Sequence, residues 1–168
     1  VFEETDLDEI IRTSVRKYAR QFIAKKISLS YEPVETTVIT DKKWLSFVIE
    51  QVISNAVKYT KTGGIKIYLE DGDGTMSVPV QKASHRKEDD GENSGMKSVR
   101  LVIEDTGIGI RAEDLPRICE MGYTGCNGHE GQHSSGIGLY LCSRILKKLG
   151  HTFSITSKEG VGTVVKIG

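Results

Sequence analysis

Three segments of the chain carry apolar residues at the spacing of an amphipathic helix. The first follows Asp6, which we expect to form a capping box with Glu9. Its apolar positions, over about four turns, are Leu7, Ile11, Val15, Tyr18 and Phe22. The second follows the expected cap Asp41, ends near Thr60 and buries Leu45, Val48, Val52 and Ala56. The third follows Ser135, stops at Gly150 and is expected to bury Leu139, Leu141, Ile145, Leu146 and Leu149.

Short apolar or alternating segments between these helices predict strands. Residues 27–31 and 37–40 flank Pro33, so we expect a hairpin after the first helix. The other predicted strands are 65–70, 99–104, 152–157 and 163–167. The order of elements predicts a two-layer α/β sandwich, with a mixed, mostly antiparallel sheet and helices on one face.

Two regions lack apolar periodicity. Residues 71–97 are polar and rich in Gly, Ser, Lys, Glu and Asp, and we expect a mobile hairpin insertion. Residues 111–135 hold a short helical piece near 114–119 and then a glycine-dense loop, typical of a mobile lid. We interpret residues 1–168 as a single domain that carries both features.

Composition narrows the function classes. With 168 residues and 38% hydrophobic content, the chain can bury one core of ordinary size. The 23 basic and 23 acidic side chains cancel, which disfavours nucleic acid and direct membrane contact by overall charge. There is no membrane-length apolar stretch, and the acidic start is unlike a signal peptide. Three cysteines indicate a reducing compartment, and so a cytoplasmic, soluble chain.

Polar side chains share one face of the second helix. Gln51, Asn55 and Tyr59 are spaced by four residues, and Lys58 is three from Asn55. An amide oxygen here is a reasonable ligand for Mg²⁺, and Lys58 could meet a phosphate. A merely solvated helix face explains these residues equally well.

Two glycine-rich segments add further chemistry. Asp105 follows a predicted strand, where its carboxylate could accept from the exocyclic amine of adenine, and Gly107 and Gly109 allow close approach of a flat ring. Residues 131–139 place small residues at a helix start, which favours an anion such as phosphate. Taken singly, an ordinary tight turn and an ordinary helix cap remain open alternatives.

Together the segments resemble a known family over essentially the whole chain. Residues 51–60 (QVISNAVKYT) are similar to the N box, 105–110 (DTGIGI) to the G1 box and 135–140 (SGIGLY) to the G2 box of Bergerat-fold ATP-binding domains. Residues 160–164 (GVGTV) resemble the closing element. The resemblance is strongest to the catalytic domain of sensor histidine kinases. Residues 47–51 and 122–128 resemble a subgroup of short membrane-bound kinases associated with antimicrobial-peptide sensing in Gram-positive bacteria.

The resemblance implies roles for individual residues. Asn55 would ligate Mg²⁺, Lys58 would touch the phosphates and Tyr59 would lie near adenine or ribose. Asp105 would bind adenine N6, with Thr163 helping through water. The other implied ATP contacts are Gly107, Ile108, Gly109, Ile110, Tyr123, Thr124, Ser135, Gly136, Ile137, Gly138 and Leu139. The aromatic F box is poorly kept at 118–123, so no lid-packing role is assigned.

The residue at position 51 distinguishes an ATPase, which hydrolyses ATP, from a kinase, which transfers the phosphoryl group. Related ATPases carry a glutamate four residues before the magnesium asparagine, and an amide cannot act as a general base at neutral pH. Glu50 is rotated by about 100° on the helix. The catalytic group implied is therefore Gln51, Asn55 and Lys58, with transfer favoured over hydrolysis.

No histidine of the chain has the context of a phosphoacceptor; the four are His85, His129, His133 and His151. We therefore expect the catalytic half of a longer, homodimeric, membrane-anchored kinase. Its partners would be a separate phosphoacceptor dimerisation domain and a response regulator.

Three alternative functions share some of these features. Cys119, Cys126, His129 and His133 could form a zinc site, but their spacing is not that of a recognised finger. A serine kinase of the anti-sigma-factor type shares the fold and the motifs. A binding module without catalysis is disfavoured because Asn55, Lys58 and Asp105 are retained.

Overall fold

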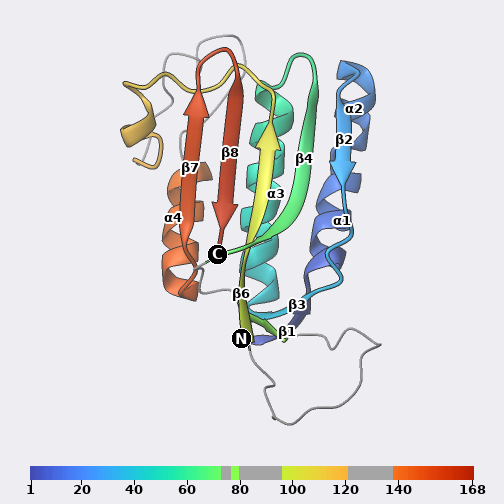
Figure 1. The fold of residues 1–168 in the computed structure, drawn as a ribbon, viewed down its shortest axis with the longest axis vertical. Coiled ribbons are helices and arrows are strands. Elements are labelled where there is room, and N and C mark those ends of the chain that lie inside the picture. Colours follow the sequence, from blue (N-terminus) through green and yellow to red (C-terminus); the bar gives the residue numbers. More distant parts are fainter. Residues whose placement is uncertain (73–76, 80–95, 121–137) are drawn as a thin grey trace, which may run out of the picture.

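The computed structural model describes residues 1–72, 77–79, 96–120 and 138–168. These residues form two layers, with a sheet in front of helices α1, α3 and α4 in Figure 1. The order in the main sheet is β2 (Ser28–Tyr31), β4 (Gly64–Asp71), β6 (Met96–Asp105), β8 (Gly162–Ile167) and β7 (Phe153–Lys158). Only the β2–β4 pair of this series is parallel. The predicted two-layer sandwich with a mixed, mostly antiparallel sheet is confirmed.

A short strand from the predicted polar insertion also joins β6. Strand β5 (Ser77–Pro79) pairs antiparallel with residues 96–98 at the start of β6. Residues 73–76 and 80–95 of the insertion lie outside the described residues. Its mobility stays a prediction.

The predicted hairpin after the first helix is wrong. β2 pairs in parallel with β4, and β3 (Thr37–Thr40) pairs with β1 (Glu3–Asp6), a strand that is not among those expected from the sequence. Parallel strands need a crossover connection, and α3 (Lys42–Tyr59) supplies it. The turn that separates β2 from β3 is held against α1 (Leu7–Lys17) instead of closing a hairpin.

Asp8 on α1 holds that turn. Its buried carboxylate accepts from the backbone amides of Val34 at 2.9 Å and Glu35 at 2.6 Å, and from the Tyr31 hydroxyl. These bonds stabilise Glu35 in a left-handed conformation with φ 41°. A buried carboxylate with several donors satisfies amides that would otherwise lack partners. The chain is thereby directed from β2 toward β1.

The first predicted helix is two helices. α1 ends at Lys17, Tyr18 leaves helical geometry with φ −104° and ψ 9°, and α2 (Ala19–Lys25) follows. The Asp6 cap is confirmed by bonds from the amides of Asp8 and Glu9. The Glu9 carboxylate, however, pairs with Lys42 at 3.0 Å instead of reaching back to the cap.

Helices α3 and α4 (Gly138–Leu149) supply much of the core. On α3 the predicted positions are buried and Asp41 caps the helix, as expected. On α4, Leu146 is fully buried, but Leu141 is 37% exposed and Cys142 occupies the buried position. The prediction for Leu141 is therefore wrong. The short helical piece near 114–119 is a single 3₁₀ turn, η1 (Leu115–Arg117).

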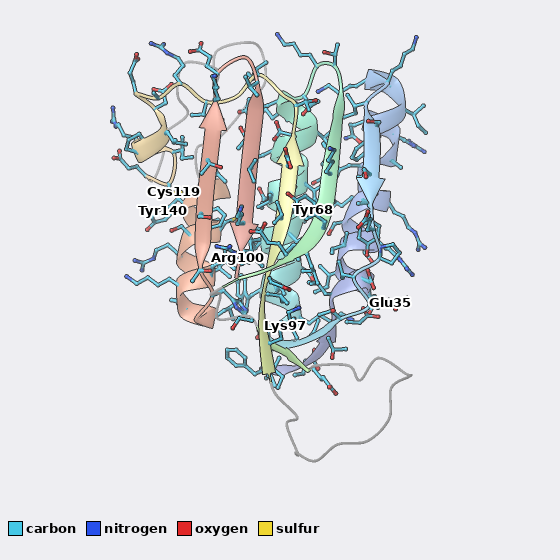
Figure 2. The ribbon with its side chains drawn as sticks, in the orientation of Figure 1. Glu35, Tyr68, Lys97, Arg100, Cys119 and Tyr140 are labelled. Atoms are coloured by element: carbon cyan, nitrogen blue, oxygen red, sulfur yellow. The ribbon has the colours of Figure 1, made fainter. Side chains whose placement is uncertain are left out.

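The sheet face away from the helices is mostly polar, as expected for a sandwich with helices on one side. Figure 2 shows Tyr68 and Arg100 on this face. The Tyr68 hydroxyl donates to Glu104 at 3.3 Å, and Glu70 pairs with Arg100 at 3.2 Å and with Lys166 at 2.8 Å. No helix within the described ranges is long and apolar enough to span a membrane.

His151, just after α4, links the helix layer to the two-stranded sheet formed by β1 and β3. Its Nε2 lies 3.0 Å from Thr40 Oγ1, and burial lowers the pKa of the imidazole, partly opposed by the Gly168 backbone. As the pH falls, the His151 imidazole is therefore protonated at a higher pH in the unfolded chain than in the folded chain. The contribution of His151 is present above about pH 6.5 and is lost as the pH falls through its folded pKa.

We expect the free energy of unfolding of the wild type to fall relative to His151→Gln between pH 7 and 5. The gap should open by about 1 kcal/mol, within the limit of about 1.4 kcal/mol per pH unit for one proton. Urea unfolding of both proteins at pH 7, 6 and 5 measures it. Parallel pH profiles would contradict the assignment.

Candidate nucleotide-binding site

The core between the sheet and α3 ends in a row of polar residues. On the helix-facing side, Ile103 pairs with Val165 and Val165 with Ile155 across β6, β8 and β7. Two residues further along each strand, the same alternation places Asp105, Thr163 and Ser157 side by side. We call these three residues the polar row. Polar groups thus replace apolar ones where the sheet edge meets the end of α3.

Asp105 is the charged member of the polar row. Its Oδ1 accepts from the Gly107 amide at 2.8 Å. Burial raises the pKa of the carboxyl, while bonds from the backbone amides of Gly107 and Thr163 lower it and Glu104 adds a small rise. A carboxylate that burial disfavours gains most from a ligand that donates a hydrogen bond to it.

The glycine loop after Asp105 lies directly on the end of α3. The Ile108 amide donates to the Tyr59 carbonyl at 3.0 Å. A Cβ at Gly107 would lie 2.6 Å from that same carbonyl oxygen, so this position needs glycine. The contact brings the G1-like loop and the end of the N-box-like helix together.

The same loop is joined to the turn between β7 and β8. The Gly160 amide donates to the Ile108 carbonyl at 2.8 Å, and the Ile110 amide donates to Ser157 Oγ at 2.8 Å. Gly109 adopts φ +72°, and a Cβ there would overlap the Lys158 carbonyl oxygen. The floor of the site is therefore built from backbone of three segments.

The polar face of α3 forms a second wall. Gln51, Asn55, Lys58 and Tyr59 are all half-buried. Lys58 Nζ lies 5.2 Å from the centroid of the Tyr59 ring. A Cβ at Gly138, the first residue of α4, would lie 3.0 Å from Gln51 Oε1. The N-box-like face, the G1-like loop and the start of α4 thus belong to one region.

Glu50 is directed elsewhere. Its carboxylate pairs with Lys17 on α1, and α1 packs against α3. Among the described residues, the carboxylate next to Gln51 in sequence is therefore engaged in an ion pair with another helix.

Some of the expected site residues are described and others are not. Tyr123, Thr124, Ser135, Gly136 and Ile137 lie outside the described residues, as do Cys126, His129 and His133 of the zinc alternative. Ile110 and Leu139 are described and half-buried. The described ranges hold no group of three or more His, Cys, Asp or Glu residues that could bind a metal.

Two residues of the region were not singled out from the sequence. Ser157 belongs to the polar row, and its signal was a polar residue in phase with the apolar Phe153 and Ile155. Lys25 on α2 donates to the carbonyls of Val57 at 2.6 Å and Lys58 at 3.0 Å, which caps the end of α3. No local sequence pattern marks Lys25 for this contact.

Comparison with protein families agrees with this geometry. Residues 40–168 match the HATPase_c model, described as histidine kinase-, DNA gyrase B- and HSP90-like ATPase. The chain belongs to this family. The HATPase_c domain here is thus an ATP-binding catalytic domain of the sensor histidine kinase class, as predicted.

Curated relatives are sensor kinases. The chain is 33% identical to the sensor histidine kinase YxdK of Bacillus subtilis, over 98% of this chain and 44% of the relative. It is 31% identical to the sensor protein BceS of Halalkalibacterium halodurans, over 96% and 41%, and 34% identical to the sensor protein kinase GraS of Staphylococcus aureus, over 80% and 32%. The HATPase_c domain spans less than half the length of these relatives.

Solved structures show the same fold. The catalytic domain of histidine kinase ThkA aligns with a TM-score of 0.72 at 21% identity, over 99% of this chain and 93% of that one. Full-length ShkA in complex with AMPPNP aligns with a TM-score of 0.73 at 19% identity, over 99% and 30%. The predicted Bergerat fold is confirmed.

Proposed function

We propose that the chain binds magnesium ATP between the polar face of α3 and the polar row, and passes the γ-phosphoryl group to a histidine. The acceptor would lie on the dimerisation domain of the same sensor kinase, within a two-component system. The observation that carries this is the meeting of three segments: the G1-like loop is bonded to Tyr59, and Gly138 lies against Gln51.

The residues present fit the nucleotide at its base end. Asp105 offers a partly desolvated acceptor suited to an exocyclic amine. Beside it, glycine at position 107 allows the loop to lie against the end of α3, because a Cβ there would be 2.6 Å from the Tyr59 carbonyl oxygen.

The α3 face fits the phosphate end. Asn55 carries the amide oxygen that we propose as the magnesium ligand, and Lys58, one turn later, would meet phosphate oxygens. Magnesium, when bound, neutralises negative charge on the phosphates. Lys25 supports this end because its ammonium group caps the carbonyls of Val57 and Lys58 and so fixes the last turn of α3. From the lid segments, we propose the contacts expected from the sequence at Tyr123, Thr124, Ser135, Gly136 and Ile137, with Leu139 beside them.

Transfer is favoured over hydrolysis because, within the described residues, the polar face of α3 carries no carboxylate that could act as a base for water. Gln51 is an amide, and Glu50, rotated by about 100° around α3, pairs with Lys17 on α1. The contribution of the chain would be to position the phosphates and to supply charge, and the acceptor histidine would come from elsewhere. For the parent protein, we propose a membrane-anchored homodimer with this domain in the cytoplasm and a response regulator as the next acceptor.

The magnesium role predicts a metal-dependent defect. In Asn55→Ala we expect ATP affinity in Mg²⁺ to fall at least about tenfold, the loss of one charge-assisted contact. Affinity in EDTA should change little. Isothermal titration calorimetry under both conditions measures this. Ser54→Ala is the matched control, because Ser54 is half-buried on the same helix turn.

Phosphotransfer gives a separate check. Mixed with the dimerisation domain of its parent kinase, the wild-type chain should label a histidine, whereas Asn55→Ala should not. If Asn55→Ala bound magnesium ATP like the wild type, the metal assignment would be wrong. Labelling that proceeds without the dimerisation domain would contradict the proposed acceptor.

A further inference from the structure

The hydroxyl of Ser157, near the end of β7, makes three polar contacts. Its Oγ accepts from the Ile110 amide at 2.8 Å, donates to the Gly162 carbonyl at 2.9 Å and lies 2.8 Å from Thr163 Oγ1. The proposed site includes Ser157 in the polar row but gives its hydroxyl no contact with the nucleotide. Its three contacts nevertheless fix where the hydroxyl protons of the polar row must be.

A serine hydroxyl has one proton to donate. The Ile110 amide and the Gly162 carbonyl are a fixed donor and a fixed acceptor, so the Ser157 proton goes to Gly162. The contact between Ser157 and Thr163 then requires Thr163 to donate. The opposite arrangement would place two oxygen lone pairs against each other at the Gly162 carbonyl. Only one proton arrangement therefore satisfies all three contacts.

The consequence for Thr163 is a fixed polarity. With its only hydroxyl proton directed at Ser157, Thr163 Oγ1 offers lone pairs, and no donor, to anything else that approaches it. Asp105 is paired with Thr163 across the strands and is an acceptor when ionised. The Thr163 backbone amide also points to the Asp105 carboxylate. Both donors of Thr163, its hydroxyl and its backbone amide, are therefore used within the protein.

We propose that Ser157 is a specificity-determining residue that acts by positioning the Thr163 proton. With that proton directed to Ser157, the side chains of Asp105 and Thr163 offer only hydrogen-bond acceptors to the base. Such a surface favours a purine with an amine at C6 over one with a carbonyl there. This inference rests on the proposed nucleotide site. It adds a residue that touches neither base nor phosphate and selects between bases through Thr163.

The test compares ADP with IDP, in which a carbonyl replaces the C6 amine and N1 carries a hydrogen. We expect the wild type to prefer ADP and Ser157→Ala to lower the ratio of the two affinities about fivefold, because Thr163 can then donate to the carbonyl. Calorimetry with each nucleotide in Mg²⁺ measures the ratio. Thr156→Ala is the matched control, since Thr156 is exposed on the other face of β7 and should leave the ratio unchanged.

A purely structural role gives a different result. Ser157→Ala also removes the acceptor of the Ile110 amide, which weakens both nucleotides together and leaves their ratio alone. In a double-mutant cycle, Thr163→Val should abolish the effect of Ser157→Ala on the ratio, because no Thr163 proton remains to be directed. Ser157→Thr, which keeps a hydroxyl, should restore most of the wild-type preference.

The outcomes separate this inference from the proposed function. If the wild type binds neither nucleotide, the nucleotide site itself is wrong. If it binds ADP over IDP and Ser157→Ala keeps that ratio, the site stands and the role of Ser157 is refuted. An equal effect of Ser157→Ala in the Thr163→Val background would refute it as well.

Discussion

Asp105→Asn is expected to weaken ATP binding about 100-fold while leaving the domain at least as stable as the wild type. The substitution removes a charged acceptor and places an amide that also carries donors opposite the adenine amine. Hydrogen bonds to charged groups contribute about 1.5–3 kcal/mol, and about 2.7 kcal/mol corresponds to the 100-fold loss.

Stability should move in the other direction. Burial raises the pKa of Asp105, so the folded protein disfavours the ionised carboxyl relative to the unfolded chain. This unfavourable contribution is fully present above the folded pKa and disappears as the pH falls below the unfolded value. The neutral side chain of Asp105→Asn removes this unfavourable contribution, and the amide oxygen can still accept from the Gly107 amide. A site kept for function at a cost in stability behaves in this way.

The measurement pairs calorimetry for ATP with urea unfolding at pH 7. Glu104→Gln is the matched control, because Glu104 is the neighbouring carboxylate and lies on the opposite face of the sheet, bonded to Tyr68. It should retain wild-type affinity. Wild-type affinity in Asp105→Asn would remove the base end of the proposed site. A loss of binding that comes with loss of folding would leave Asp105 with a structural role only.

Local patterns were sufficient for the elements around the site. The apolar spacing of α3, its Asp41 cap and the alternation of β6 and β8 are visible in the sequence because each depends on neighbouring residues. Strand pairing is not local. The sequence of residues 27–40 is compatible with a hairpin, and the bonds from Asp8 to Val34 and Glu35 are what direct β3 toward β1.

The break at Tyr18 shows the same limit. Neither glycine nor proline occurs there, and the apolar spacing continues to Phe22. Packing decides the geometry: Phe22 is 8% exposed, the adjacent Ile23 is 77% exposed, and Lys25 reaches the end of α3. Tertiary contacts of this kind override local propensity.

The motif residues of the site are contiguous in sequence, and for that reason they could be singled out. The structure brings Tyr59, Gly107 and Ile108 together and places Gln51 beside Gly138. Lys25 bonds to the Lys58 carbonyl, 33 residues away, and Ser157 accepts from the Ile110 amide, 47 residues away. No local sequence pattern predicts the contact of Lys25. Ser157 could have been noticed, because it is a polar residue on the strand face that is otherwise apolar.

Gly109→Ala is expected to have the largest effect on stability, lowering the free energy of unfolding by about 3 kcal/mol. Part of this, about 1–2 kcal/mol, is the cost of a side chain in left-handed geometry, here φ +72°. The remainder comes from the Lys158 carbonyl, which the added Cβ would overlap. Backbone on both sides of this contact is tied by the bond from the Gly160 amide to the Ile108 carbonyl, so relaxation is costly.

Gly160→Ala separates the two causes. Gly160 has nearly the same conformation, φ +76°, but nothing lies within 4 Å of an added Cβ. It should lose only the conformational part, about 1–2 kcal/mol. Urea unfolding of the three proteins without nucleotide gives both differences. Equal losses would mean that the turn between β7 and β8 moves freely against the G1-like loop. A larger loss in Gly109→Ala would support a floor that is rigid before any nucleotide binds, as the fixed polarity of the adjoining polar row requires.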